Sequence, residues 1–221
     1  MEYDAPAVSA VRKRGRPVGA DSEQTRRTIV CAARELIAER GYHAATFQQI
    51  AARAGVSRPT LHYYYATREQ LYEALLADVR DSVDACAAEA VQAKTLLTQL
   101  AVFGAGIQRL GAAEPALMKV LVTARIDHHR GTHRHDTASA LAAAVHAFYD
   151  AVVVEAVRRG ELPPDTDAHA VADMLGALFW GLGFHTGFIG GDEHASGIAR
   201  QLFGCLAHGL LDSQRPAPVD A

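Results

Sequence analysis

Cysteine is scarce in this chain of 221 residues, which has only Cys31, Cys86 and Cys205, far apart in the sequence. Their number and spacing match neither a disulfide framework nor a CxxC zinc pattern, so we interpret them as reduced, mostly buried small residues. No uninterrupted apolar run reaches the ~18 residues that a membrane-spanning helix needs, and the N-terminus lacks the apolar segment of a secretory signal. We therefore expect a cytoplasmic protein with no membrane partner.

The sequence also lacks the alternation of apolar and polar residues that marks half-buried strands, and it has no internal repeat. It has no HExxH pair, no glycine-rich phosphate loop and no nucleophile–base pattern. Four histidines between His128 and His135 favour a metal-dependent enzyme such as a hydrolase, but neighbouring histidines in a loop have no fixed geometry. We predict no catalytic residue, no metal site and no cofactor, and keep this enzyme as an alternative hypothesis.

The chain does have an ordinary globular composition, 49% apolar and 21% charged, with its charge unevenly spread. Residues 12–67 contain ten lysines and arginines against four acidic residues, whereas residues 68–221 contain twelve against nineteen. A basic N-terminal third on an acidic remainder predicts an anionic partner at one end of the molecule. A DNA-binding domain joined to a separate regulatory domain has this charge distribution.

Two helix-start signals lie close together between residues 46 and 60. Thr46 and Gln49 have the spacing of a capping box, and Ser57 can cap a second helix with Pro59 in its first turn. Gly55 stands between them, where a helix end favours a left-handed residue. Helix, glycine-containing turn and helix together predict a helix-turn-helix, whose second helix enters the major groove of DNA.

The second helix of this motif has two kinds of side chain. Leu61 and Tyr65 lie four residues apart and can both face the core, which leaves the neighbouring polar and aromatic residues to point outward. Thr67 with Gln70 then marks the start of a third helix. The outward residues of the second helix are therefore the candidates for reading DNA.

These motifs resemble the TetR family of bacterial one-component regulators. The resemblance is carried by Gln49-Ile50-Ala51, Ala54-Gly55-Val56-Ser57, Pro59-Thr60-Leu61, the aromatic run ending at Tyr65, and Arg68. It is dense over about residues 25–76, and beyond them only length and helical pattern agree. The chain departs from the common pattern at His62, Tyr64 and Arg68, where many members have Tyr, His and Lys. The family implies an all-α fold with an N-terminal three-helix helix-turn-helix DNA-binding domain and a C-terminal helical effector-binding and dimerisation domain.

The predicted DNA contacts come mostly from the second helix of the motif. Arg58 can bond guanine in the major groove, and Pro59 and Thr60 can touch a thymine methyl group. His62, Tyr63 and Tyr64 suit phosphate contacts, and Arg68 adds charge to a helix start that already favours phosphate. The resemblance adds Thr46 and Gln48 as backbone contacts. Arg14 and Arg16, in the basic run before the domain, either enter the minor groove or only attract phosphate non-specifically.

We expect four segments along the chain. Residues 1–21 form a disordered basic arm, 22–67 the DNA-binding domain, 68–213 the effector-binding and dimerisation domain, and 214–221 a frayed tail. The periodicity predicts helices over about residues 22–40, 68–90, 94–110, 115–127, 137–159, 167–188 and 194–211, besides the two short ones of the motif. Gly111 is expected to end the third of these helices.

An effector pocket is expected among the middle helices by resemblance. Its predicted lining is apolar with a few polar groups, as is usual for small-molecule sites. The candidates are Phe103, Ile107, Met118, Leu121, Phe148, Trp180 and Phe184, with Arg125, Tyr149 and His185 as the polar groups. This lining predicts an apolar or amphipathic small-molecule effector.

The last two helices are rich in small residues and apolar almost all round, so a partner surface must cover them. In TetR-like proteins these helices form a four-helix bundle with those of a second subunit, and an operator with two half-sites requires the same two-fold symmetry. The sequence thus predicts a homodimeric regulator, a repressor that binds a palindromic double-stranded DNA operator and is released by its effector. The alternative is a helical ligand- or protein-binding module without specific DNA binding, favoured by the departures at His62 and Tyr64.

Overall fold

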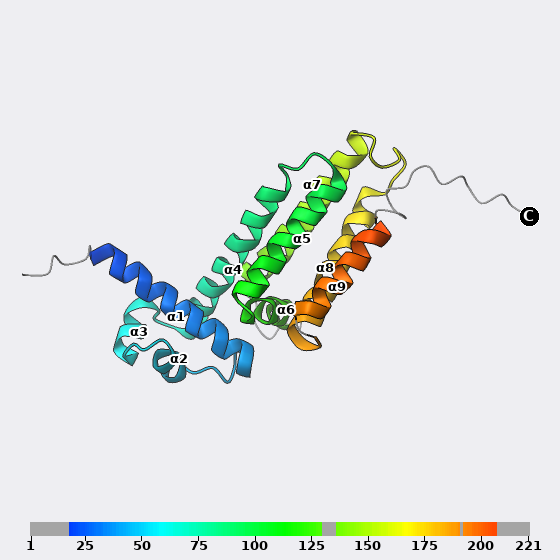
Figure 1. Cartoon of the computed structure of the whole chain (residues 1–221). Helices are drawn as coiled ribbons and strands as arrows, with labels where there is room; N and C mark the ends of the chain where they lie inside the picture. Colours follow the sequence, from blue (N-terminus) through cyan, green and yellow to red (C-terminus); the bar gives the residue numbers. More distant parts are fainter. Residues whose placement is uncertain (1–17, 130–135, 191, 207–221) are drawn as a thin grey trace, which may run out of the picture.

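A computed structural model describes residues 18–129, 136–190 and 192–206, and the regular structure in these ranges is helical (Figure 1). The helices are α1 (Val18–Arg40), α2 (Phe47–Arg53), α3 (Arg58–Tyr64), α4 (Arg68–Ala90), α5 (Leu96–Ala113), α6 (Ala116–His129), α7 (Asp136–Arg158), α8 (Ala168–Phe188) and α9 (Asp192–Cys205). The first three form a small domain, and α4 leads from it into a larger helical body. The predicted all-α architecture is confirmed.

The small domain is built around the apolar face of α1. Ile29, Ala33 and Leu36 of α1 are buried, together with Ile50 of α2 and Leu61 of α3. Gly55, the predicted turn residue between α2 and α3, has a φ of +66°, and the residue that follows α1 has a φ of +80°. Because only glycine adopts such angles freely, Gly41 and Gly55 fix both chain reversals.

Helix α1 begins at Val18, earlier than the start near Ser22 that the sequence predicted. Residues 18–21, assigned to the arm, therefore belong to the helix. Asp21 does not precede the helix as a cap but lies in its first turn, where a negative charge interacts favourably with the helix dipole. The rest of the arm, with Arg14 and Arg16, lies outside the described residues.

In the body, α4, α5 and α7 lie side by side, α8 and α9 form a second pair, and α6 crosses beside the small domain (Figure 1). The prediction that Gly111 ends α5 was wrong, because Gly111 is buried inside the helix. The helix ends instead at Glu114, whose φ of −137° and ψ of 81° are non-helical. Pro115 follows, and a residue before proline is disfavoured in the helical region.

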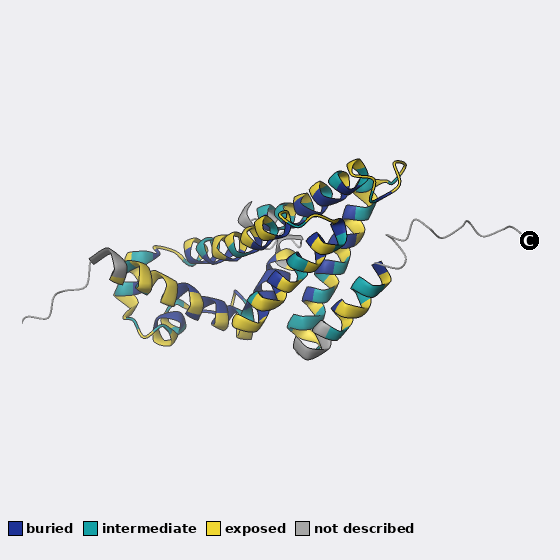
Figure 2. Cartoon of the chain, turned by 45° about the horizontal axis from the view of Figure 1, so that its top comes forward, coloured by how far each residue is buried: buried dark blue, intermediate teal, exposed yellow. Residues whose placement is uncertain are grey.

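Helix α7 shows how the body buries its core. Its stretch Ala140–Arg158 has a mean hydropathy of 1.6, enough by length and composition alone to cross a membrane. In the fold one side of this helix faces the core, with Val145, Phe148 and Val152 buried. Figure 2 shows buried and exposed sides on the helices of the body. The Phe148 ring stacks on Phe103 of α5 at 4.3 Å between centroids. Burial of such aromatic pairs holds α5 and α7 together.

Glycines of α8 serve packing within the chain as well as the predicted partner surface. A Cβ at Gly183 would lie 2.9 Å from Met118 Cε, and one at Gly187 would lie 3.3 Å from the Lys119 Cα. These two glycines let α6 approach α8 closely. A Cβ at Gly181 would meet nothing within 4 Å. The small residues of this helix therefore have two different roles.

Candidate DNA-binding surface and effector cavity

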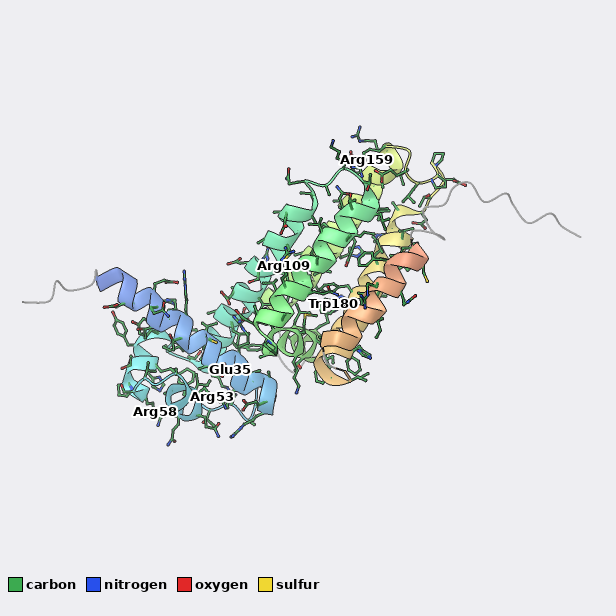
Figure 3. The ribbon with its side chains drawn as sticks, viewed as in Figure 1. Glu35, Arg53, Arg58, Arg109, Arg159 and Trp180 are labelled. Carbon is green, nitrogen blue, oxygen red and sulfur yellow. The ribbon has the colours of Figure 1, made fainter. Side chains whose placement is uncertain are left out.

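The outer face of α3 carries side chains that the other described residues leave uncovered. The Ser57 side chain accepts a hydrogen bond from the Thr60 backbone N–H at 3.1 Å, which caps the helix as predicted. Arg58 and Pro59 are exposed, and Tyr63 is 83% exposed. Figure 3 shows Arg58 on the part of the small domain that lies away from the body. A projecting arginine and an uncovered tyrosine on one short helix suit a polyanionic partner.

Two neighbours of these residues are held by ring contacts. The His62 ring meets Phe47 of α2 edge-on, with centroids 4.9 Å apart. The guanidinium of Arg26 lies 5.7 Å from the Tyr64 ring centroid and 5.5 Å from that of Tyr65. His62 therefore contacts α2, and Tyr64 contacts α1, which gives the two departures from the family pattern a packing role.

Arg68 is engaged within the small domain. Its guanidinium lies 4.4 Å from the centroid of the Tyr42 ring and donates to the backbone carbonyl of His43 at 3.2 Å. These contacts join the start of α4 to the turn after α1. The structure thus places Arg68 in a supporting position, and its phosphate contact stays a prediction.

At the start of α2, Thr46 forms the predicted capping box with Gln49. Thr46 and the neighbouring Gln48 are both exposed, at the N-terminal end of the helix where phosphate is favoured. Thr60, in α3, is half-buried and its hydroxyl lies 2.7 Å from that of Ser57. The helix-turn-helix residues predicted to contact DNA thus lie in one domain, as expected from the sequence.

An ion-pair group that the sequence analysis missed fixes α2 against α1. Arg53 of α2 donates to both carboxylate oxygens of Glu39 at 2.8 Å and to Glu35 at 3.2 Å (Figure 3). The hydrogen bond from Arg53 lowers the pKa of Glu39, and the same two carboxylates raise the pKa of Arg53. A helix of seven residues is too short to be stable alone, so this bidentate link helps to orient it.

The body contains a cavity of about 430 Å³ between α5, α6, α7, α8 and α9. Its volume lies within the roughly 300–1,000 Å³ of small-molecule sites. Most of its wall is apolar, and four predicted residues line it: Phe103, Ile107, Met118 and Tyr149. Burial raises the pKa of the Tyr149 hydroxyl, which keeps that group neutral as a hydrogen-bonding partner.

Polar groups from α5 stand at one part of the cavity wall. Gln108 and Arg109 both line it, and neither was predicted from the sequence. Arg109 Nη2 lies 3.0 Å from Glu89 Oε2 of α4, and both side chains are largely exposed. A single arginine near the end of an otherwise apolar helix did not identify this position from the sequence. The cavity thus combines an apolar wall with one accessible cation.

Six residues predicted for the pocket do not line this cavity: Leu121, Arg125, Phe148, Trp180, Phe184 and His185. Leu121 and Phe148 are buried in the core, and Arg125 and Phe184 are exposed. Trp180 packs edge-on against Phe179, whose own side chain lines the cavity. The predicted residues come from four of the helices that border the cavity, and none was predicted on α9, whose Leu202 and Phe203 also line it. Their role in binding an effector stays a prediction.

Helix α8 carries a continuous apolar stripe on its exposed side. Met174, Ala177, Gly181, Phe184 and Phe188 are all exposed and follow one another at intervals of three and four residues. The Phe184 and Phe188 rings stack at 5.2 Å between centroids. This spacing is typical of a helix face that packs against another helix. We call these five residues the α8 stripe.

Comparison with known proteins gives the same assignment for the N-terminal domain. Residues 29–75 match the model of the family described as bacterial regulatory proteins, tetR family. This stretch of the chain thus contains the DNA-binding domain that this family of regulators shares. The HTH-type transcriptional activator FasR of Mycolicibacterium smegmatis is 43% identical over 54 residues, which are 24% of this chain and 25% of that relative. The matched part thus spans about a quarter of that curated relative.

Two solved structures resemble the whole fold. The crystal structure of a gamma-butyrolactone receptor aligns with a TM-score of 0.71 and 24% identity, covering 89% of this chain and 93% of its own. The transcriptional regulator FadR from Bacillus subtilis, solved in complex with stearoyl-CoA, aligns with a TM-score of 0.68 and 19% identity, covering 83% and 98%. At these identities the likeness establishes the TetR fold of the body and no more.

Proposed function

We propose that this TetR-family chain is a ligand-responsive transcriptional regulator that binds a palindromic DNA operator as a homodimer. The observation that carries the proposal is the exposed outer face of α3, with Arg58 at its start and Tyr63 uncovered, on a basic domain that matches the family model. An arginine at the start of a recognition helix can read guanine, and tyrosine suits phosphate. The cytoplasm, where the DNA is, is the expected compartment.

The α8 stripe supports the dimer. Five exposed apolar positions in one row, two of them phenylalanines, leave apolar surface in water on a single subunit. Packing two copies of α8 about a two-fold axis buries this surface and repeats the helix-turn-helix as a symmetric pair. A pair of recognition helices then faces two half-sites one helical turn apart, about 34–36 Å.

The cavity supports an apolar or amphipathic effector. Its wall of leucine, phenylalanine and methionine favours a hydrocarbon chain or ring, and Arg109 favours an anionic or strongly polar group at one end. The gamma-butyrolactone receptor and the FadR complex with stearoyl-CoA, which share this fold, are consistent with such amphipathic molecules. We infer an effector with an apolar body and a polar or anionic head.

Two helices connect this cavity to the DNA-binding domain. Helix α4 holds Glu89 against Arg109 of the cavity wall and continues into the small domain. Helix α6 contributes Met118 to the cavity and packs directly against α1. An effector that binds one arrangement of these helices more tightly shifts the population toward it. We propose that the arrangement favoured by the effector spaces the two recognition helices so that they no longer fit the two half-sites of the operator. The protein would then be a repressor.

The decisive experiment measures fluorescence anisotropy of labelled DNA from the regions flanking the gene for this protein, against scrambled DNA of equal length, at two salt concentrations. We expect tight binding of the flanking DNA with two subunits per site, and weaker, strongly salt-dependent binding of the scrambled DNA. The same complex then serves to screen amphipathic compounds for release of DNA.

Equal and weak binding of both DNAs would show only non-specific attraction to phosphate. A genome-wide selection of bound fragments would then be used to search for the operator. Failure of that selection would overturn the proposal in favour of a binding module without specific DNA recognition. A reporter gene under the operator distinguishes repression from activation, since the relative FasR is named an activator.

A further inference from the structure

A group of imidazoles and carboxylates lies on the surface between α7 and α8, outside the DNA-binding face and the cavity lining. His146 and Asp150 are four residues apart on α7, and His169 and Asp173 are four residues apart on α8. The two helices are antiparallel, so each histidine faces the aspartate of the other helix (Figure 1). Two helical i,i+4 pairs in register place four ligand-type side chains together.

The possible ligand atoms of this group lie close together, slightly farther apart than the ligands around a bound zinc ion. His146 Nδ1 lies 3.6 Å from Asp173 Oδ1, and His169 Nε2 lies 3.8 Å from Asp173 Oδ2. One ligand atom from each of these three residues lies within 4.8 Å of the other two. Ligands of tetrahedral Zn²⁺, each about 2.0–2.2 Å from the ion, are roughly 3.3–3.5 Å apart. Small side-chain rotations therefore suffice.

The fourth residue has a supporting position. Asp150 Oδ1 lies 3.7 Å from His169 Nδ1, the ring nitrogen that does not face Asp173. A carboxylate behind a metal-binding histidine accepts the second N–H and fixes the ring orientation and tautomer. An ordinary surface ion pair joins two side chains. Here two histidines lie near one carboxylate, and a second carboxylate lies near the other ring nitrogen of one of them. This arrangement distinguishes the group from a chance cluster of charges.

We propose that His146, His169 and Asp173 bind one first-row divalent transition-metal ion, with Zn²⁺ as the probe, and that Asp150 orients His169. Two imidazoles and one carboxylate form a recurrent zinc ligand set whose fourth position is filled by water. The His169 side chain is 71% exposed, so that position is open to solvent. The bound ion links α7 to the first turn of α8.

The site adjoins the proposed effector cavity through the chain itself. Tyr149, next to Asp150, and Leu175, two residues after Asp173, both line that cavity. A metal ion that fixes the spacing of α7 and α8 therefore also constrains two cavity walls. Metal binding itself depends only on the four side chains, so its test is independent of the DNA-binding function.

The test measures Zn²⁺ binding to the full-length protein, first stripped with a chelator, by competition with a chromophoric chelator. We expect one tightly bound ion per chain, and an increase of the unfolding temperature with Zn²⁺ because the ion binds only the folded chain. His169→Ala should lose that ion while its circular dichroism stays helical, since the side chain is exposed. Asp150→Asn should keep the stoichiometry and bind about 10- to 100-fold more weakly.

The matched control is a variant in which His128, His129, His133 and His135 are replaced by asparagine, because these histidines can also attract metal. It should retain the tight ion. Absence of a tight ion in the wild-type chain would overturn the proposal. So would an ion that survives His169→Ala and disappears in the control variant, because the metal would then belong to the other histidines.

Discussion

Arg34 of α1 forms an ion pair with Glu114 at the end of α5, so one side chain joins the DNA-binding domain to the body. The Arg34 side chain is 5% exposed and also pairs with Asp78 of α4. Its Nε is buried without a partner among the described residues. A buried guanidinium needs its carboxylates, because burying a charge without a counter-charge is costly.

Removing both carboxylates of Arg34 should destabilise the protein. We expect Asp78→Asn with Glu114→Gln to lower the free energy of unfolding by about 2 kcal/mol or more, less than a fully buried pair because both carboxylates are half-exposed. The control is Asp84→Asn, which breaks an exposed pair with Arg80 and should cost less than about 1 kcal/mol. Urea unfolding measures both. Equal small losses would show that Arg34 does not depend on these partners.

Arg58→Ala should weaken operator binding by about 1–3 kcal/mol and relax the base preference at one position of each half-site. Arg158→Ala removes the same charge next to Arg159, at the end of the body away from the small domain, and should leave operator affinity unchanged (Figure 3). Anisotropy titrations with single-base operator variants make the comparison. Unaltered discrimination at every position in the Arg58 variant would refute a base-reading role.

Phe184→Asp should convert the dimer to monomers, because a charge in the middle of the α8 stripe would be buried against the partner copy. The Phe184 side chain is 43% exposed in the single subunit, so the fold should tolerate the change. Val154→Asp on α7 is the control, since Val154 is exposed to a similar degree and lies outside the stripe. Analytical ultracentrifugation gives the mass of each variant. Dimers in both variants would place the interface elsewhere.

Arg109→Gln should weaken binding of effectors with an anionic head by at least about 1 kcal/mol while neutral analogues with the same apolar body bind as before. The reason is that Arg109 is the cation found on the cavity wall of the described chain. Calorimetry with matched pairs of a carboxylic acid and its methyl ester separates the contribution of the charged head from that of the apolar body. An equal loss of affinity for both members would show that Arg109 maintains the shape of the cavity and does not bind the anionic head.

Stability should fall below about pH 5 partly through Glu39. Its pKa is lowered by Arg53, so its contribution is fully present above the unfolded-state pKa of roughly 4.3 and is lost as the pH falls through the folded value. Glu39→Gln should flatten the dependence of the unfolding midpoint on pH in this range. In an Arg53→Met background, Glu39→Gln should have little effect on the slope of the unfolding midpoint against pH. A slope that Glu39→Gln leaves unchanged in the wild-type chain would contradict the pairing.

Local signals in the sequence determined the small domain. Thr46, Ser57 and Thr67 cap helices as predicted, and Gly41 and Gly55 have the left-handed backbone that ends helices. Capping and turn chemistry act over three or four residues, so they can be recognised in the chain before it folds. The same short range explains why the helix-turn-helix was predicted correctly. Of the residues expected to face outward, Tyr64 is half-buried beside Arg26, and the DNA contacts stay predictions.

Tertiary structure decided which faces of the longer helices meet. Gly111 lies buried inside α5 near Met118, and Phe184 turns outward although it resembles a core residue. Arg109 reaches the cavity, and His146 meets Asp173, only because α4, α5, α7 and α8 pack in one particular register. A helix that is apolar on several sides does not encode which side is covered. That choice depends on contacts between residues far apart in the chain, which periodicity within one helix cannot specify.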